Sequence, residues 1–362
     1  MSLSQLRRSK HQSAATQRGI RLPQLPRKQQ TWRVALWKSV ECSPVHSPRD
    51  RRGYKYQIPT QQVPNSHLRL SLPSVCGTRL PPSITHVHFA SLPGSWKGRC
   101  KLHNQDYYFD MSRDASRVFG VCDGHGLNGH SVAQFIAERL PAILYRKVAL
   151  KATESTSTAL MDAYAECQQQ LSEAAIDTTQ SGSTCLSLLL VDSVLVCASV
   201  GDSRAVVGRK IGGIWGVCQL SWDHRTDNCL ETERIVQCGG EVTQAKRSRL
   251  KHSRIYLKDT LVPGLSLTRS LGDSIVASIG VTAEPDLGVL TLSDNDKFVL
   301  VGTRGLWEVM DSIEAVRLAA ETYEQSAETV PELLVQEAQR RWKARGLLID
   351  DVTVGLAVIS SQ

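Results

Sequence analysis

The sequence has few aromatic residues, no C-x-x-C pair and no long uninterrupted apolar segment. Phe, Trp and Tyr make up 6% of the 362 residues. The ten cysteines form no pair or cysteine–histidine cluster with zinc-finger spacing, so neither structural zinc nor a disulfide framework is expected. The longest apolar stretch, Cys185–Val200, is interrupted by Asp192 and Ser193, which excludes a membrane span of about 20 residues. Cysteines inside apolar runs act as small hydrophobes and indicate a reducing, intracellular compartment.

Acidic residues are almost absent from the first hundred positions. That part holds 17 Lys and Arg against two acids, Glu41 and Asp50, whereas residues 101–362 hold 26 basic and 33 acidic residues. Hydrophobic residues (41%) and charged residues (22%) are close to the globular average, which excludes a wholly disordered or fibrous chain. Because the positive charge lies at one end and the rest is mildly acidic, no nucleic-acid partner is expected.

The basic end is also rich in proline. Nine of the 14 prolines fall within residues 1–84, and apolar periodicity is absent there. We therefore predict a disordered segment at 1–84 and a folded domain at 85–362. The segment is consistent with a solvated linker, with an organelle transit peptide, or with a nuclear-import or polyanion-binding tail using Arg7–Lys10 or Arg49–Arg52. Cytoplasm or nucleus is the expected location, and organelle import stays an alternative.

From about Thr85 the pattern becomes that of a folded protein. Short apolar or alternating runs predict strands, and apolar residues at helical spacing predict helices. The predicted strands include His86–Ala90, Tyr107–Phe109, Val118–Cys122, Cys185–Val191, Val194–Val200, Phe298–Val301 and Val352–Ile359. The predicted helices are His130–Leu144, Leu160–Leu171, Ile313–Tyr323 and Leu334–Trp342. Strands in hairpins and helices in pairs favour an α+β domain, in which antiparallel sheets carry helices on their outer faces.

Several aspartates stand where a predicted strand begins or ends. They are Asp106, Asp123, Asp202, Asp350 and Asp351. Any one of them alone is more typical of a turn or cap residue. Carboxylates that converge at a sheet rim repel one another unless a cation neutralises them, and such oxygen ligands suit Mg²⁺ or Mn²⁺.

These residues occur in a series of motifs that together resemble a known family. In chain order the motifs are Asn104–Asp106, Val118–Gly126, Ser181–Thr184, Ala198–Val206, Asp223–Arg225, Glu233–Ile235, Gly239–Val242, Pro263–Asp273, Gly280–Pro285, Gly305–Met310 and Asp350–Val354. The series resembles the PPM-type (type 2C) metal-dependent serine/threonine protein phosphatases over roughly residues 86–360. The basic end lies outside the resemblance.

The resemblance implies a four-layer αββα sandwich and a hydrolytic activity. In that family two metal ions, Mg²⁺ or Mn²⁺, share a water that attacks the phosphorus of a phosphoserine or phosphothreonine, and no phosphoenzyme forms. The implied partner is a phosphoprotein substrate or a signalling protein, and a monomer is expected.

The family's site residues carry over position by position. Asp123 resembles the carboxylate that bridges both metals, and Gly124 resembles the carbonyl ligand of the second metal. Asp350 resembles a ligand of the first metal, and Asp202 a ligand of a third, weaker one. Gln105 stands where many relatives have Glu, and Asp106 resembles the acid beside it. His125 resembles the proposed general acid, and Lys101 is either a phosphate contact or a solvated lysine.

One position departs from the family pattern. Where relatives carry the sequence Ser-Asp before Gly-Leu-Trp, this chain has Thr303 and Arg304, so a carboxylate ligand of the first metal becomes a guanidinium. Arg304 either turns to solvent or occupies the first metal position and pairs with Asp350 or Asp123. Two functions therefore stay open: a phosphatase impaired at one position, and a pseudophosphatase that binds a phosphoprotein or signalling partner without turnover.

A run of basic residues lies in the stretch that forms a flap beside the cleft in the family. Residues 246–254 contain six Lys, Arg or His positions. They either steer acidic or phosphorylated partners or form a solvated loop. Charge reversal at Lys246, Arg247 and Arg249 distinguishes these two roles. If the loop steers partners, the reversal should lower partner affinity and reduce the salt dependence of that affinity.

Overall fold

The computed structural model describes residues 35–36, 82–113, 116–150, 156–243, 253–346 and 348–360. The predicted disordered segment 1–84 and the basic residues 246–252 therefore lie almost entirely outside the described residues. The predicted domain boundary at 84/85 stays a prediction, although the first long strand begins at Ser83.

Six α-helices and two short 3₁₀ helices are described. The α-helices are α1 (Gly129–Leu150), α2 (Thr156–Glu173), α3 (Cys229–Gln237), α4 (Arg304–Trp307), α5 (Ser312–Tyr323) and α6 (Val330–Arg345). The 3₁₀ helices are η1 (Ser274–Ile279) and η2 (Ala327–Thr329). Side-chain caps start two of the α-helices: Asn228 accepts from the N–H groups of Leu230 and Glu231, and Asp311 accepts from Glu314. Among the described residues, no helix is both long enough and apolar enough to cross a membrane.

The first large sheet has the strand order β1-β11-β10-β17-β19-β2. Its strands are β1 (Ala35–Leu36), β11 (Ile214–Gln219), β10 (Arg204–Ile211), β17 (Asp296–Gly302), β19 (Val352–Ser360) and β2 (Ser83–Leu92). All neighbouring pairs are antiparallel except β1 with β11. The predicted strands at 298–301 and 352–359 thus lie side by side in this sheet.

The second large sheet has the order β15-β7-β6-β8-β9-β16, with β5 also paired to β6. Its strands are β15 (Leu271–Gly272), β7 (Gly182–Ser183), β6 (Ser116–His125), β8 (Cys185–Val191), β9 (Val194–Val200), β16 (Asp286–Thr291) and β5 (Asp106–Arg113). The predicted hairpin around Asp192 and Ser193 is confirmed as β8–β9, and Asp192 adopts a left-handed φ of 54° at its turn.

Two small sheets complete the fold. One consists of β12 (Glu241–Thr243), β13 (Arg254–Tyr256) and β14 (Pro263–Leu265), and we call it the flap sheet. The other consists of β18 (Leu348–Ile349), β3 (Ser95–Trp96) and β4 (Arg99–Cys100).

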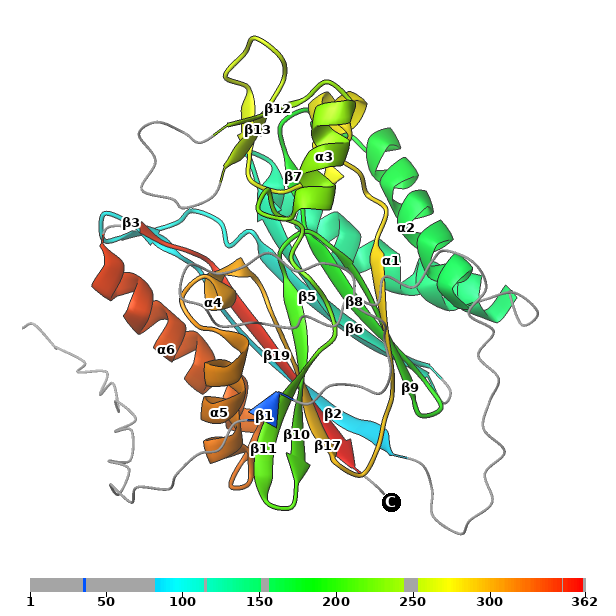
Figure 1. Ribbon diagram of the computed structural model, residues 1–362, viewed down its shortest axis with the longest axis vertical. Helices are drawn as coiled ribbons and strands as arrows, with labels where there is room; N and C mark the ends of the chain where they lie inside the picture. The colour runs from blue at the N-terminus through cyan, green and yellow to red at the C-terminus, as the bar shows by residue number, and fades with distance from the viewer. Residues whose placement is uncertain are drawn as a thin grey trace, which may run out of the picture. The chain divides into compact units, whose positions relative to one another are not determined.

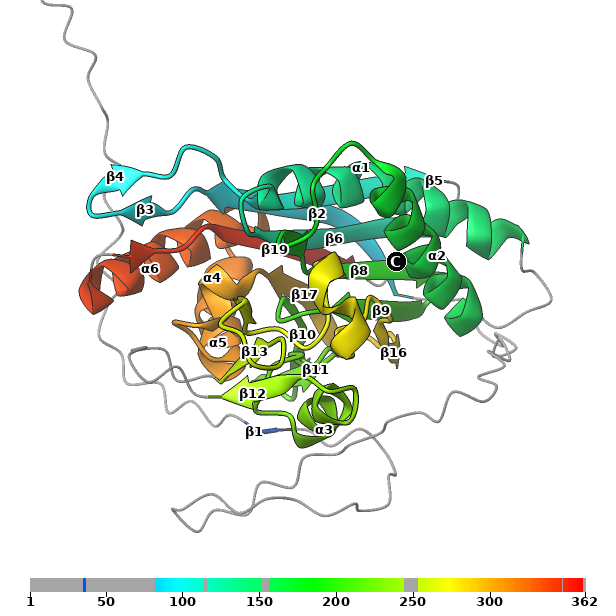
Figure 2. The same ribbon diagram turned by 90° about the horizontal axis from the view of Figure 1, so that it is seen from above.

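The layers stack as helices, sheet, sheet, helices, and each interface has its own apolar core. Figure 1 shows α1 and α2 on one side of the two sheets and α5 and α6 on the other, and Figure 2 shows the same layers from above. One core lies under α1 and α2, one under α5 and α6, and a third, with Phe119, Leu188 and Val299, between the sheets. Since burying such a side chain contributes about 1.5–3 kcal/mol, these cores hold the sheets rigidly together. The predicted α+β sandwich is confirmed.

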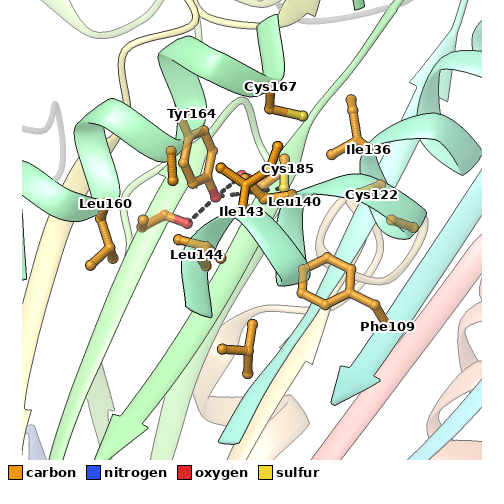
Figure 3. Packing of buried hydrophobic residues seen from close by; sticks show 14 of the residues in the cluster. Phe109, Cys122, Ile136, Leu140, Ile143, Leu144, Leu160, Tyr164, Cys167 and Cys185 are labelled. Atoms are coloured by element: carbon orange, nitrogen blue, oxygen red, sulfur yellow. Dashed lines mark hydrogen bonds between the residues drawn. The ribbon is translucent and has the colours of Figure 1, made fainter. Parts of the chain in front are cut away.

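The core under α1 and α2 contains a buried tyrosine hydroxyl. Tyr164 hydrogen-bonds with Ser187 Oγ at 2.9 Å and donates to the carbonyl of Ala198 at 2.8 Å. Figure 3 shows it among Leu160, Cys167 and Cys185. These bonds join α2 to β8 and β9, the strands that lead to the site described next.

Candidate active site

The aspartates named from the sequence converge at one end of the two sheets. Asp106 begins β5 and faces Asp123, near the end of β6, in the strand ladder. Asp202 follows the end of β9, and Asp350 precedes β19. Asp106, Asp202 and Asp350 are buried and Asp123 is half-buried, so rigid backbone holds the carboxylates close together in a region of low dielectric.

Asp123 and Gly124 lie at the centre of this group. The Asp123 N–H donates to Thr184 Oγ1 at 3.0 Å, and Asp123 Oδ2 accepts from the backbone N–H of Arg304 at 3.1 Å. Burial raises the pKa of Asp123 to about 7, although the guanidinium of Arg304 acts in the opposite direction. A Cβ on Gly124 would lie 2.2 Å from the carbonyl oxygen of Gly129, so only glycine allows this close approach to α1.

The guanidinium of Arg304 forms an ion pair with Asp350. Arg304 Nη2 lies 2.6 Å from Asp350 Oδ2, and the two side chains are 35% and 11% exposed. The contact is an ion pair without an aligned hydrogen bond, since Asp350 Oδ2 accepts no hydrogen bond among the described residues. The charge of Asp350 raises the pKa of Arg304 further above its usual range, so the guanidinium stays charged.

The backbone around Arg304 is fixed on both sides. Thr303 donates its N–H to the carbonyl of Thr353 at 3.0 Å and its hydroxyl to Asp106 Oδ2 at 2.7 Å. A Cβ on Gly305 would lie 1.9 Å from the carbonyl oxygen of Asp351, which shows how closely α4 approaches β19. Because these contacts prevent a shift of the backbone, the ion pair between Arg304 and Asp350 can break only if the Arg304 side chain rotates.

Lys101 forms ion pairs with Asp350 and with the neighbouring Asp351. Its ammonium lies 3.2 Å from Asp350 Oδ1 and 2.9 Å from Asp351 Oδ2. Burial lowers the pKa of Lys101, but the two carboxylates raise it by more. Asp350 therefore lies between two cations, Lys101 and Arg304.

Asp202 also has a cationic partner. Arg225 Nε donates to Asp202 Oδ2 at 3.0 Å, and Arg225 Nη1 donates to Glu308 Oε2 at 3.2 Å. The Arg225 and Asp202 side chains are 9% and 3% exposed. A buried pair of this kind is strongly coupled, since removing one partner leaves the other charge uncompensated.

Gln105 and Asp106 support the centre through hydrogen bonds. Gln105 donates its side-chain N–H to the carbonyl of Gly126 at 2.8 Å, and its own carbonyl accepts from the Gly124 N–H at 3.0 Å. Asp106 Oδ1 is buried without a hydrogen-bond partner among the described residues. Burial and the nearby charge of Asp123 raise the pKa of Asp106 well above its usual value.

His125 is held by Asp273. Its Nε2 lies 2.6 Å from Asp273 Oδ2, which also accepts from Ser270 Oγ at 2.6 Å. Burial lowers the pKa of His125, but the charge and hydrogen bond of Asp273, together with the charges of Asp123 and Asp202, raise it by more, so Nε2–H donates to the Asp273 carboxylate. The imidazole thus lies beside the cleft with one nitrogen fixed.

A cleft of about 270 Å³ lies over this centre. Its wall comes from the sheet ends, from the flap sheet and from the loop that follows it. Its lining residues are Asp123, His125, Gly126, Gln180, Thr184, Asp202, Arg254, Pro263, Gly264, Leu265, Ser266, Leu267, Asp273 and Arg304.

The residues do not fit a two-metal centre as they are arranged. Asp350 is paired with Arg304 and Lys101, and Asp202 is paired with Arg225. In the part of the chain that the structure describes, no three His, Cys, Asp or Glu side chains are grouped to hold a metal ion. Asp123 and the carbonyl of Gly124 remain as donors, but two donors are fewer than a hard divalent cation takes.

The sequence matches the family described as protein phosphatase 2C over residues 97–344. The chain belongs to this family. This protein phosphatase 2C chain is 30% identical to "Probable protein phosphatase 2C 72" of Arabidopsis thaliana over 270 residues, which cover 70% of this chain and 81% of the relative. It is 32% identical over 239 residues to "Probable protein phosphatase 2C 64" of Oryza sativa subsp. japonica, covering 64% of this chain and 55% of that relative. The chain therefore spans about half of the rice protein.

Solved structures show the same fold. A serine-threonine phosphatase 2C from Toxoplasma gondii has a TM-score of 0.62 and 20% identity, covering 80% of this chain and all of that one (100%). A C. elegans sex determining protein has a TM-score of 0.62 and 21% identity, covering 76% of this chain and 65% of that one. At such identities the likeness concerns the fold alone.

The structure adds two residues to which the sequence assigned no role, Arg225 and Asp273, and it places Arg254 of the basic run at the cleft. Arg225 and Asp273 lie within quoted motifs, but only the fold shows that they contact Asp202 and His125. Arg254 lines the cleft from the flap sheet and carries no motif signal apart from the basic run around it.

Proposed function

We propose that this protein phosphatase 2C chain binds phosphorylated serine and threonine side chains of partner proteins without the metal-dependent turnover typical of its family. The observation that carries this proposal is the ion pair between Arg304 and Asp350. The resemblance implies a metal-ligand aspartate at this position, so in this proposal Arg304 supplies a permanent cation in its place. In this proposal Arg304 and Lys101 neutralise Asp350, and Asp123, Gly124 and Asp202 no longer serve a two-metal centre.

The chemistry of the cleft supports anion binding. A guanidinium has five N–H donors, and one nitrogen of Arg304 contacts Asp350, so others are left for phosphoryl oxygens. Arginine binds phosphate through paired, charge-assisted hydrogen bonds. The Arg304 side chain is 35% exposed, which leaves it accessible from the cleft that it lines.

The absence of turnover follows from the same charge. A guanidinium stabilises negative charge on phosphate, but it cannot deprotonate in a protein and so supplies no hydroxide nucleophile at neutral pH. His125 remains at the cleft as a proton donor for a leaving alkoxide, yet a donor alone does not generate the attacking group.

A second candidate function is metal-dependent hydrolysis by a protein serine/threonine phosphatase, with Mg²⁺ or Mn²⁺ as cofactor. Asp123, Gly124 and His125 favour it, because they resemble the residues that the family's mechanism uses. It requires Arg304 to rotate away from Asp350 when the metal binds. The partial exposure of Arg304 favours such a rotation.

Two measurements on the full chain separate the candidates. One is the Mn²⁺-dependent hydrolysis of 4-nitrophenyl phosphate by the wild type and by Arg304→Asp. The other is the binding of phosphothreonine peptides and of the same peptides without phosphate. The proposal predicts an inert wild type that retains phosphate-dependent peptide binding. Wild-type turnover that EDTA abolishes would instead support the second candidate.

A further inference from the structure

We propose that Arg254, on β13 of the flap sheet, is a second phosphate-binding residue of the cleft and contacts the same phosphoryl group as Arg304. This inference rests on the proposed function and names the residue by which the flap sheet takes part in it. Both arginines line the same cleft of about 270 Å³, although they belong to segments 50 positions apart in the sequence.

The position of Arg254 is fixed by the packing of its strand. β13 is the central strand of the flap sheet, where Arg254 pairs with Thr243 and Ile255 pairs with Leu265. Ile255 is fully buried in the apolar cluster that joins this sheet to α3 and η1. Since neighbouring side chains on a strand point to opposite faces, burial of Ile255 turns Arg254 away from this apolar cluster, and Arg254 lines the cleft.

The charge of Arg254 has no counterion among the described residues. Its Nη1 donates to the carbonyl of Gly264, which orients the guanidinium along the wall of the cleft. The other cations of the site differ, because Arg304, Arg225 and Lys101 each contact a carboxylate. A half-buried guanidinium that is oriented but not neutralised is suited to bind an anionic ligand.

The ligand chemistry follows from the size and charge of the cleft. Acidic residues on its wall, such as Asp123, Asp202 and Asp273, repel any anionic ligand, so a bound anion must gain more from the two guanidinium groups than it loses to these carboxylates. A phosphate monoester brings up to two charges and three acceptor oxygens, enough to bridge two guanidinium groups. Arg254 is therefore expected to contribute to discrimination between phosphorylated and unphosphorylated peptides.

The test compares Arg254→Gln with a matched control on the same hairpin. Lys258→Gln removes the same charge from an exposed position that does not line the cleft. Calorimetry of the full chain uses two probes, inorganic phosphate and a mixture of phosphothreonine peptides with randomised flanks. We expect Arg254→Gln to bind both probes ten- to a hundredfold more weakly, because each charge-assisted hydrogen bond contributes about that factor. Arg254→Lys should lose less, and Lys258→Gln should bind like the wild type.

The outcomes distinguish this inference from the proposed function. If Arg254→Gln binds both probes as tightly as the wild type, or if Lys258→Gln weakens binding equally, the inference is wrong while the proposed function stands. If the wild type binds phosphate through Arg254 but does not prefer phosphopeptides, the proposed function is wrong and the phosphate site remains. A wild type that binds neither probe overturns both.

Discussion

Replacing Arg304 by aspartate should restore metal binding to this cleft. The substitution removes the guanidinium that lies 2.6 Å from Asp350 Oδ2 and adds a carboxylate at a position whose backbone is fixed by Thr303 and Gly305. Among the described residues, Lys101 then remains as the cationic partner of Asp350. The local net charge falls by two units, which favours a divalent cation in the place of the guanidinium.

The size of the effect follows from Coulomb's law. A guanidinium about 4 Å from a dication costs roughly 8 kcal/mol at an effective dielectric of 20. Because the Arg304 side chain is 35% exposed, solvent screening reduces this cost substantially. We therefore expect a change of about 3 kcal/mol or more, which corresponds to at least a hundredfold tighter Mn²⁺ binding by Arg304→Asp than by the wild type.

Calorimetric titration of the full chain with Mn²⁺ measures this directly. Arg304→Gln is the matched control, since it removes the positive charge without adding a ligand and should give an intermediate affinity. Thermal unfolding of each variant checks that the fold is retained. Stoichiometric binding of two Mn²⁺ ions by the wild type, as tight as in Arg304→Asp, would refute the reasoning.

Three further substitutions test how the fold supports the site. Tyr164→Phe removes a hydroxyl bonded to Ser187 and to the Ala198 carbonyl and should lower the free energy of unfolding by about 1–3 kcal/mol, measured by urea denaturation. Burial raises the pKa of Glu231, but hydrogen bonds from Arg269 and Arg234, together with the charge of Arg269, lower it by more. The ionised Glu231 side chain therefore adds to the free energy of unfolding at neutral pH, and this contribution is lost as the pH falls below about 4.5. Glu231→Gln should therefore cost about 3–5 kcal/mol at pH 7, and the gap to the wild type should narrow at pH 3; a constant gap would contradict this. Gly305→Ala should lower the free energy of unfolding by about 1–3 kcal/mol, because the added methyl group would clash with the carbonyl of Asp351. An unchanged free energy of unfolding would show that α4 can shift to make room for it.

Much of the fold could be predicted from local patterns. Helices such as α5 and strands such as β8 and β9 carry clear apolar periodicity, so their existence and type follow from sequence. The strands of the flap sheet do not, since a strand of three residues is too short to show periodicity. These strands are held by pairing with one another within residues 241–265. The helix α3 was also missed, because Leu230 and Val236 on it are exposed and weaken the apolar stripe.

The site could be predicted in part. Asp106, Asp123, Asp202 and Asp350 were expected to converge at the sheet ends, and the fold brings them together. A pairing of Arg304 with Asp350 or Asp123 was one of two alternatives, and the structure places the guanidinium on Asp350.

Partners that depend on long-range packing could not be predicted. Lys101 was considered a phosphate contact or a solvated lysine, but it lies against Asp350 and Asp351, some 250 positions later in the sequence. The ion pair between Arg225 and Asp202 and the contact between His125 and Asp273 likewise depend on how strands from different parts of the chain meet. A sequence motif identifies such residues, but it does not say which charges neutralise one another.

The central claim is that Arg304 keeps this cleft from metal-dependent catalysis, and hydrolysis of 4-nitrophenyl phosphate in Mn²⁺ tests it most directly. The measurement uses the full chain, with wild type and Arg304→Asp side by side and EDTA as the control. The account predicts a wild-type rate at background and a Mn²⁺-dependent rate for Arg304→Asp. Wild-type hydrolysis that depends on Mn²⁺ and stops with EDTA would contradict it.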